Sequence, residues 1–381
     1  MILDRKNPNS EPVEGEIVKI VDSNGKTLGV GHWQIGSIAV RILEFGVDAL
    51  PAHFWRDRIT AAYRVRHSLG LTTGNNNTYR LVHGEGDFLP GLIIDIYADT
   101  AVVQAHSVGM HLHREEIAEA IVNAVPEVKN VYYKSDDTLP FKAPISPEEK
   151  VGYLIQSKIK NQKSAEVFWA CENGLDFRID WLRGQKTGFF VDQRENRALL
   201  ERYAKDKDVL NMFCYTGGFS VYALRGGAHS VCSVDVSEKA VNLVRENVER
   251  NFPGCDRHQA IAADCFDFFG EIEKNKQSYD LIVLDPPAFA KHRDAIKNAL
   301  RGYQRLNAKG IEAVRPGGII FTFSCSQAID KEMFRLAVFS AAASVGRKVR
   351  ILHQLHQPQD HPINIYHPEG EYLKGLVLQV E

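Results

Sequence analysis

The 381-residue chain has no run of eighteen consecutive apolar residues, which excludes a membrane-spanning helix of ordinary length. Its start, MILDRKNPNSEPVEGE, contains no apolar segment, so we expect no secretory signal. The six cysteines form no C-x-x-C pair, which argues against a structural zinc site or a disulfide scaffold and fits a reducing, cytoplasmic setting. Hydrophobic residues make up 44% and charged residues 25%, an ordinary composition for a globular protein of two or three domains.

The first half of the chain shows two strand-rich patterns. Residues 13–45 have the pattern of short strands broken by turns, and the DSNG turn between two alternating runs indicates a hairpin. A helical stretch follows, and residues 79–134 alternate strands with one amphipathic helix. Residues 142–163 are rich in Pro, Lys and Glu, so we predict a loop there.

The second half alternates buried apolar runs with amphipathic helices. This pattern is typical of a mostly parallel, doubly wound sheet. We therefore predict an α/β protein with three domains: a small β-rich domain over residues 1–74, a central α+β domain over residues 75–164, and a Rossmann-like domain over residues 165–381.

Small or acidic residues follow the ends of four predicted strands, where open α/β sheets bind their ligands. The first strand leads into Cys-Tyr-Thr-Gly-Gly before a helix, and the next three end at Asp235, Asp264 and Asp285. An acid after the second strand suits the ribose of a dinucleotide or of S-adenosylmethionine. The G-x-G-x-x-G fingerprint is missing, and an Asp-Pro-Pro-x-Phe corner suits a flipped base, so the pattern favours S-adenosylmethionine. Each Asp taken alone is equally compatible with a helix cap or a turn.

Five segments together resemble one known family. VLNMFCYTGGFS, SVDVS, LDPPAF, FTFSCS and GQKTGFFVDQRENR are similar to the RlmI-type bacterial methyltransferases, which make 5-methylcytosine in large-subunit (23S) ribosomal RNA. The resemblance runs over nearly the whole chain and implies an N-terminal PUA RNA-binding domain. Family members usually begin with a basic, aromatic stretch that this sequence does not have, so we expect its PUA domain to be N-terminally incomplete. Phe88 stands where a Gly is common in the family.

The resemblance also implies the residues that bind S-adenosylmethionine. Those in or near GQKTGFFVDQRENR would lie against the cofactor, and its Gln and Arg suit the methionine carboxylate; a strand and a helix cap are the alternative for this stretch. Four residues around the first strand end would contact the methionine part, Asp235 the ribose and Asp264 the adenine amino group. The cofactor set is Lys186, Thr187, Phe190, Gln193, Arg194, Asn211, Phe213, Thr216, Gly217, Asp235, Asp264 and Asp285.

Carbon 5 of cytosine is a poor nucleophile until a thiolate adds to carbon 6. Cys325, in Phe-Ser-Cys-Ser at the end of the strand after LDPPAF, is the predicted nucleophile, although a buried Cys is usually only a small hydrophobe. Asp285 would contact the N3 and amino edge of the base and support its protonation. Ala288 stands where some RNA cytosine methyltransferases have a second Cys, so we predict a single-cysteine mechanism whose carbon-5 base the sequence does not identify. The base pocket would comprise Pro286, Pro287 and Phe289.

The formal charge of −2 hides a local basic segment next to this corner. Residues 290–310 contain six basic residues and one Asp, and four of the basic ones recur every four residues, as on one face of a helix. A solvated helix face is the ordinary explanation, but the position beside the predicted catalytic corner favours phosphate contact. The predicted RNA-binding residues are Lys291, Arg293, Lys297, Arg301, Arg305 and Lys309. A second cluster that would extend the track is Arg56, Arg58, Arg64 and Arg66.

Other functions fit parts of the pattern. An enzyme with the same cofactor that methylates a guanine or an exocyclic amine would need no thiol, and an RNA-binding ribosome assembly factor would need no catalysis. We expect ribosomal RNA or a precursor of the ribosomal subunit as the partner, no membrane, and leave a homodimer open. A metal is not expected, because the spacing of His353, His356, His361 and His367 matches no zinc pattern.

Overall fold

The computed structural model describes residues 2–4, 12–140, 145–157, 167–290 and 293–381. The chain folds into two compact units, and it passes between them more than once. The first unit comprises residues 1–174, 179–191 and 359–370, and the second comprises residues 175–178, 192–358 and 371–381. In the described part of the chain, no helix combines the length and the apolar character needed to cross a bilayer.

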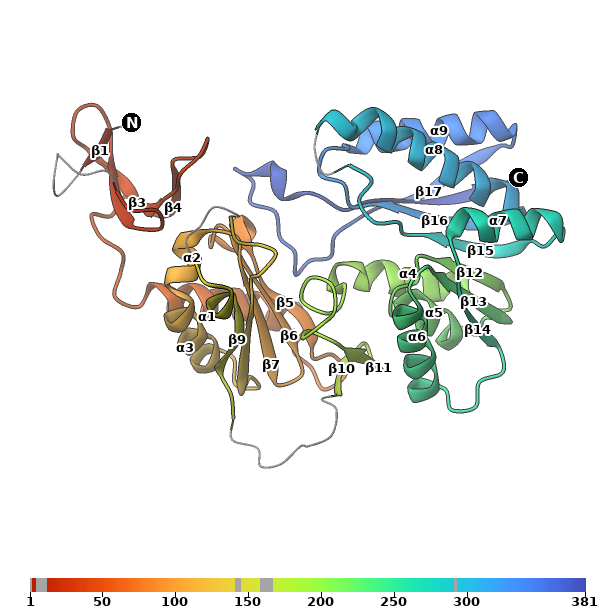
Figure 1. The fold of residues 1–381 in the computed structure, drawn as a ribbon, viewed down its shortest axis with the longest axis horizontal. Helices are drawn as coiled ribbons and strands as arrows, with labels where there is room; N and C mark the ends of the chain where they lie inside the picture. The colour runs from red at the N-terminus through yellow and green to blue at the C-terminus, as the bar shows by residue number, and fades with distance from the viewer. Residues whose placement is uncertain (1, 5–11, 141–144, 158–166, 291–292) are drawn as a thin grey trace. The chain divides into compact units, whose positions relative to one another are not determined.

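The first unit begins with a four-stranded antiparallel sheet in the order β1-β2-β3-β4 (Figure 1). Its strands are Ile2–Asp4, Ile17–Val21, Thr27–Trp33 and Val40–Phe45. The predicted DSNG hairpin is confirmed: the Asp22 carboxylate accepts hydrogen bonds from the backbone N–H groups of Asn24 and Lys26 at 2.8 and 2.9 Å, and Gly25 has a φ of 81°.

The rest of the first unit is a five-stranded sheet in the order β5-β6-β7-β8-β9, with helices packed against it. The strands are β5 (Thr78–His83), β6 (Leu92–Tyr97), β7 (Thr100–Ala105), β8 (Asn130–Lys134) and β9 (Val151–Ile155). The helices are α1 (Phe54–Ser68), α2 (Val108–Leu112), α3 (Arg114–Ala124) and the 3-10 turns η1 (Gly84–Asp87) and η2 (Pro147–Lys150).

The loop predicted over residues 142–163 is wrong in its middle, where β9 pairs antiparallel with β8. The apolar run VGYLI is short and lies among Pro, Lys and Glu, so composition concealed an edge strand that pairing with β8 stabilises. The turn η2 precedes β9, and residues 142–144 and 158–163 of that prediction lie outside the described residues.

The predicted hairpin near residue 170 is confirmed as β10 (Phe168–Glu172) and β11 (Leu175–Ile179). The second unit contains a seven-stranded sheet in the order β14-β13-β12-β15-β16-β18-β17, parallel except for β18, which runs antiparallel to both neighbours. The strands are β12 (Asp208–Met212), β13 (Ser230–Asp235), β14 (His258–Ala262), β15 (Tyr279–Leu284), β16 (Val314–Ser324), β17 (Val349–His356) and β18 (Lys374–Val380).

Helices cover both faces of this sheet, as predicted for a doubly wound fold. Figure 1 shows α4, α5 and α6 along one face and α7, α8 and α9 along the other. Strand order reverses between β12 and β15, which is where such sheets bind ligands. The helices are α4 (Arg194–Tyr203), α5 (Gly218–Arg225), α6 (Glu238–Asn251), α7 (Cys265–Lys274), α8 (Ile296–Ala313) and α9 (Lys331–Val345), with 3-10 turns η3 (Val191–Gln193), η4 (Arg293–Ala295) and η5 (Pro368–Gly370).

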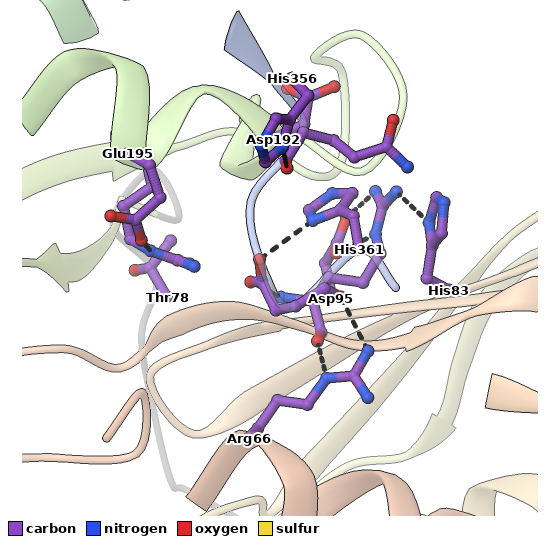
Figure 2. Close-up of polar contacts among 12 residues, drawn as sticks. Arg66, Thr78, His83, Asp95, Asp192, Glu195, His356 and His361 are labelled. Atoms are coloured by element: carbon purple, nitrogen blue, oxygen red, sulfur yellow. Dashed lines mark hydrogen bonds and ion pairs between the residues drawn. The ribbon is translucent and has the colours of Figure 1, made fainter. Parts of the chain in front are cut away.

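A segment between β17 and β18, residues 359–370, belongs to the first unit and is held there by a buried polar network (Figure 2). The fully buried Arg66 forms an ion pair with Asp87 and donates a hydrogen bond to the carbonyl of Asp360 at 2.7 Å. The Asp360 carboxylate accepts from the backbone N–H of Arg80 at 2.9 Å and lies 3.0 Å from Nδ1 of His361. The Asp-His-Pro motif is therefore an anchor within this unit.

Candidate functional site

The loop after β12 has an unusual backbone. Phe213, Tyr215 and Gly217 have φ values of 57°, 47° and 80°, so every second residue is left-handed, a conformation that costs energy for the two aromatic residues. A Cβ on Gly217 would lie 2.7 Å from Cγ1 of Val244, so only glycine fits between this loop and α6. Strained backbone held in place by its surroundings is typical of ligand-binding loops.

Two side chains keep this loop in place. The Asp235 carboxylate accepts a hydrogen bond from the backbone N–H of Tyr215 at 2.9 Å, and the Asn247 amide donates to the carbonyl of Thr216 at 2.8 Å. The second oxygen of Asp235 accepts from the backbone N–H of Ser237 at 2.9 Å. Asp235 therefore joins the loop after β12 to the turn after β13.

Asp264 caps helix α7, because its carboxylate accepts from the backbone N–H groups of Phe266 and Asp267 at 2.8 and 3.3 Å. The alternative considered for each Asp, a turn or a cap, thus describes part of what Asp235 and Asp264 do. An ionised carboxylate has about four acceptor positions, so both retain capacity for a ligand, and their ribose and adenine roles stay predictions.

A buried polar chain runs beneath the loop. The Asn211 amide donates to Ser220 at 2.8 Å, Ser220 lies 2.6 Å from Ser233, and Ser233 lies 2.8 Å from Nε2 of His258. Burial lowers the pKa of His258 to about 4, so this chain is neutral at pH 7. Within the described residues the buried Oδ1 of Asn211 has no hydrogen-bond partner. An unmet buried acceptor at this strand end fits a ligand with a donor group, such as the amino group of S-adenosylmethionine.

The structure divides the residues predicted from GQKTGFFVDQRENR between the two units. In the first unit, the Thr187 hydroxyl donates to Asp95 at 2.6 Å and lies 2.9 Å from the Tyr97 hydroxyl, while the Lys186 ammonium lies 4.8 Å from the centroid of the Phe190 ring. The side chain of Thr187 therefore anchors its segment to β6. A cofactor role for these three predicted residues stays a prediction.

In the second unit, Gln193 and Arg194 are buried at the start of α4. The Gln193 amide donates to the Asp285 carboxylate at 3.0 Å, and its oxygen accepts from Asn196 at 2.7 Å. The side-chain amide of Gln193 is therefore engaged with the Asp-Pro-Pro corner after β15. This contact brings a predicted cofactor residue onto the predicted catalytic carboxylate.

Cys325 is half-buried and directly follows β16, the strand beside β15. The hydroxyl of Ser324 donates to that of Tyr303 on α8 at 2.9 Å, and the hydroxyls of Tyr303 and Ser326 lie 3.0 Å apart. The backbone N–H of Ala290 donates to Ser326 at 3.3 Å. The two serines therefore fix the backbone on both sides of the cysteine, and Ser326 ties it to the segment after Asp-Pro-Pro.

The other residues of the predicted base pocket differ in exposure. Pro286 is buried, Pro287 is exposed, and Phe289 is half-buried with its ring centroid 4.7 Å from that of Tyr303. Sequence reasoning missed Tyr303. The only signal for it was one aromatic residue among the basic residues of α8.

A lysine that sequence reasoning also missed lies beside the cysteine segment. Lys374 is the first residue of β18 and is paired with Ser324 in the register of β16 and β18. Its ammonium donates to the carbonyl of Ser326 at 2.6 Å, and its side chain is buried. Burial lowers the pKa of Lys374 to about 8, and the negative charge of a Cys325 thiolate acts in the opposite direction.

Three other cysteines of the second unit, Cys214, Cys232 and Cys265, are poorer candidates for the nucleophile. Burial raises the pKa of Cys232 to about 11 and that of Cys214 well above its usual value. Burial, and to a smaller extent the negative charge of Asp264, raises the pKa of Cys265 to about 11. A thiol with a raised pKa contributes little thiolate at pH 7, which disfavours these three cysteines as the nucleophile.

The predicted basic stripe lies on α8. Lys297, Arg301 and Arg305 are exposed, and the guanidinium of Arg305 lies 4.9 Å from the centroid of the Phe266 ring. Lys309 forms ion pairs with Glu273 and Glu312 at 3.0 and 2.8 Å, so its charge is already compensated. Lys291 lies outside the described residues, and Arg293 begins η4. RNA binding by these residues stays a prediction.

The second basic cluster is wrong for Arg66, which is fully buried in its ion pair with Asp87. Arg58 is half-buried against Glu44 at 2.5 Å, Arg56 pairs with Asp57 at 3.3 Å, and Arg64 is exposed. The charged partners lie far from Arg66 and Arg58 in the sequence, so the Arg spacing alone could not predict this pairing.

Each histidine of the C-terminal group has a different neighbour. His353 lies 2.8 Å from the Tyr203 hydroxyl, and His356 lies 2.7 Å from the carbonyl of Gln357. His361 contacts Asp360, and His367 lies 3.4 Å from Glu369. Among the residues that the structure describes, no three His, Cys, Asp or Glu side chains are grouped to hold a metal ion.

Comparisons with known proteins agree with this architecture. A family model described as an S-adenosylmethionine-dependent methyltransferase matches residues 157–366, and one for a PUA-like domain matches residues 4–45. Ribosomal RNA large subunit methyltransferase I from Tolumonas auensis is 40% identical over 371 residues, covering 97% of this chain and 91% of the relative. The protein of the same name from Alteromonas mediterranea is 39% identical over 368 residues, covering 96% and 90%.

Solved structures show the same fold. A SAM-dependent methyltransferase from Streptococcus mutans has a TM-score of 0.81 at 23% identity, covering 97% of this chain and 93% of that one. A methyltransferase complexed with SAH has a TM-score of 0.82 at 24% identity, covering 98% and 93%. The predicted α/β fold class is therefore confirmed over nearly the whole chain.

Proposed function

The chain belongs to the ribosomal RNA large subunit methyltransferase I family, and from this premise we propose that it forms 5-methylcytosine in 23S ribosomal RNA through a covalent bond between Cys325 and the base. The protein is an S-adenosylmethionine-dependent methyltransferase acting on ribosomal RNA. The single observation that carries the finer proposal is the placement of Cys325 between two serines that bind Tyr303 and, through Ser326 and Ala290, the segment that follows the Asp-Pro-Pro corner.

The residues around Cys325 and Asp285 divide the work. The Cys325 thiolate adds to carbon 6, the electron pair of the carbon 5–carbon 6 double bond forms a double bond between carbons 4 and 5, and the pair of the carbon 4–N3 double bond moves to N3, which takes up a proton from the Asp285 side. Carbon 5 then gains the methyl group that S-adenosylmethionine supplies as an electrophile. When a base or water removes the carbon-5 proton, the electron pair re-forms the carbon 5–carbon 6 double bond and the bond from sulfur to carbon 6 breaks, which restores the thiolate. The proton on N3 then returns to the Asp285 side, so the base is left neutral.

The residues that would hold the cofactor are those around the loop after β12. Its left-handed backbone, the unmet acceptor of Asn211 and the lack of a Cβ at Gly217 support this assignment. Asp235 and Asp264 would use their remaining acceptor capacity toward the ribose and the adenine. The contact of Gln193 with Asp285 would keep that carboxylate oriented toward the base.

Replacing the nucleophile is the direct test. We expect Cys325→Ala to lose methyl transfer to a 23S ribosomal RNA transcript by at least about a thousandfold, because removing a catalytic nucleophile removes the covalent route. Cys255→Ala, which changes another half-buried cysteine, should keep full activity. A transcript containing 5-fluorocytosine should remain covalently attached to the wild-type enzyme, because fluorine cannot leave as a proton does, and denaturing gels would show the adduct.

The alternatives give different results in the same experiment. Full activity of Cys325→Ala, with the label on a guanine or an exocyclic amine, would contradict the cytosine proposal and favour amine methylation. An Asp285 variant without activity that rescues every phenotype of a deletion strain would favour an assembly factor. The homodimer and a cytoplasmic location stay predictions, which light scattering and cell fractionation would test, and so do the domain boundaries at residues 74 and 164.

A further inference from the structure

Lys374 is a buried cation without a carboxylate of its own. Its ammonium donates to the carbonyl of Ser326, the residue after Cys325, at 2.6 Å. The nearest acidic residue in sequence, Glu371, instead pairs with Lys331 at 2.5 Å. Among the described residues, no carboxylate lies within ion-pair distance of the Lys374 ammonium. A buried charge without a counter-ion is costly, so its presence needs a reason.

The titratable groups that act on Lys374 are few. Cys325, Asp330 and Glu371 favour its charged form, while burial and the charge of Lys331 disfavour it. The Tyr303 hydroxyl is engaged with Ser324 and Ser326, and burial raises its pKa, so it stays neutral. A pKa of about 8 leaves Lys374 mostly protonated at pH 7, and the register that pairs it with Ser324 places Cys325, the next residue, as the candidate for its counter-charge.

We propose that the Lys374 ammonium is the counter-charge that holds Cys325 as a thiolate for its addition to carbon 6. Lys374 is then a positioning residue that acts through the cysteine, and the inference rests on the proposed function. Before substrate binds, the thiol releases its proton to solvent. As the bond from sulfur to carbon 6 forms, the negative charge moves to the base, and when that bond breaks, the electron pair returns to sulfur beside the same ammonium.

A purely structural role for Lys374, fixing the Ser326 carbonyl, is the alternative. Lys374→Gln separates the two, because glutamine keeps a hydrogen-bond donor and removes the charge. The readout is the alkylation rate of Cys325 by iodoacetamide between pH 6 and pH 10, measured peptide by peptide by mass spectrometry. This readout needs neither cofactor nor RNA.

We expect Lys374→Gln to move the midpoint of the alkylation profile up by at least about one pH unit, since an opposite charge nearby shifts a titration by that much or more. Alkylation and methyl transfer at pH 7 should both fall about tenfold and recover near pH 9.5, with an unchanged KM for RNA. Lys374→Arg should restore most of the rate. Lys331→Met removes an exposed lysine that also acts on this site, and should move the midpoint by less than about 0.3 pH units.

An unchanged alkylation midpoint in folded Lys374→Gln would overturn the proposal. If that variant does not fold, Cys325→Ala provides the reciprocal measurement: by linkage, losing the thiolate must lower the pKa of Lys374, read by NMR of ¹³C-labelled lysine, and no change would equally overturn it. Failure of the proposed function is distinguishable. In that case Cys325→Ala keeps methyl transfer, whatever the alkylation profile of Lys374→Gln.

Discussion

Two buried cations, Arg66 in the first unit and Lys374 in the second, differ in the hydrogen-bond and ion-pair partners around them. Arg66 has the carboxylate of Asp87 and the carbonyls of Arg80 and Asp360 around it, so its charge and its donors are satisfied. The Lys374 ammonium donates to one backbone carbonyl, that of Ser326 next to Cys325. Removing a partner from a fully paired buried charge therefore disturbs the fold, whereas an incompletely paired buried charge is a candidate for a site where charge changes during a reaction.

The largest expected effect comes from removing the buried Arg66. Arg66→Met should lower the free energy of unfolding by about 3–5 kcal/mol, because it leaves the buried Asp87 carboxylate uncompensated. Lys374→Met should cost no more than about 1 kcal/mol, since only one hydrogen bond to a carbonyl is lost. Urea denaturation measures both. Arg56→Met, which removes an exposed pair with Asp57, is the control and should change stability by less than about 0.5 kcal/mol. Equal losses of unfolding free energy in Arg66→Met and Lys374→Met would contradict the proposed difference between the two cations.

The next largest effect concerns Tyr303 and the two serines on either side of Cys325. Tyr303→Phe should cost about 1–2 kcal/mol, because the hydroxyls of Ser324 and Ser326 lose their shared partner. We also expect methyl transfer to fall several-fold, since the backbone around Cys325 is then less fixed. Tyr279→Phe, at the opposite end of β15, removes a buried tyrosine hydroxyl that accepts a hydrogen bond from Gln277 at 3.0 Å and also hydrogen-bonds the Cys232 thiol, away from Cys325. It should leave methyl transfer unchanged, and a parallel loss of activity in both variants would contradict the role of Tyr303.

The smallest expected effect concerns two basic residues on the surface of α8, one without and one with compensating carboxylates among the described residues. Arg301→Ala should reduce the slope of log affinity for RNA against log salt concentration by about 0.7–0.9, as expected for one lost phosphate contact. Lys309→Ala should change that slope by less than half as much, because Glu273 and Glu312 already compensate its charge. Filter binding over a salt series measures both slopes, and a larger effect for Lys309 would contradict this ranking.

Elements made by local pattern could be predicted from the sequence. The apolar runs of the second half form the expected strands, and the turn chemistry of Asp22 and Gly25 forms the expected hairpin. β9 was missed because pairing with β8, rather than its own five residues, decides its conformation. The left-handed φ of 59° at Phe88 gives a physical reason why a Gly is common there in the family.

Within the candidate site, the sequence could predict only the residues that directly follow the ends of parallel strands. Cys325, Asp285 and the loop after β12 follow from the rule that ligands bind beyond the carboxyl ends of parallel strands. Lys374 could not be found in this way, because β18 comes last in the chain yet pairs antiparallel with β16. Its alignment with Ser324 is a matter of register between distant segments. The burial of Arg66 was missed for the same reason.

The anchor formed by residues 359–370 has a consequence for synthesis of the protein. Arg66 emerges early from the ribosome, but the Asp360 carbonyl that it binds is 294 residues further along the chain. N-terminal domains ordinarily complete their folding while the rest of the chain is still being made. Here the first unit can satisfy its buried arginine only when translation is nearly finished, so a truncated product released before residue 359 lacks an interior part of its own N-terminal unit.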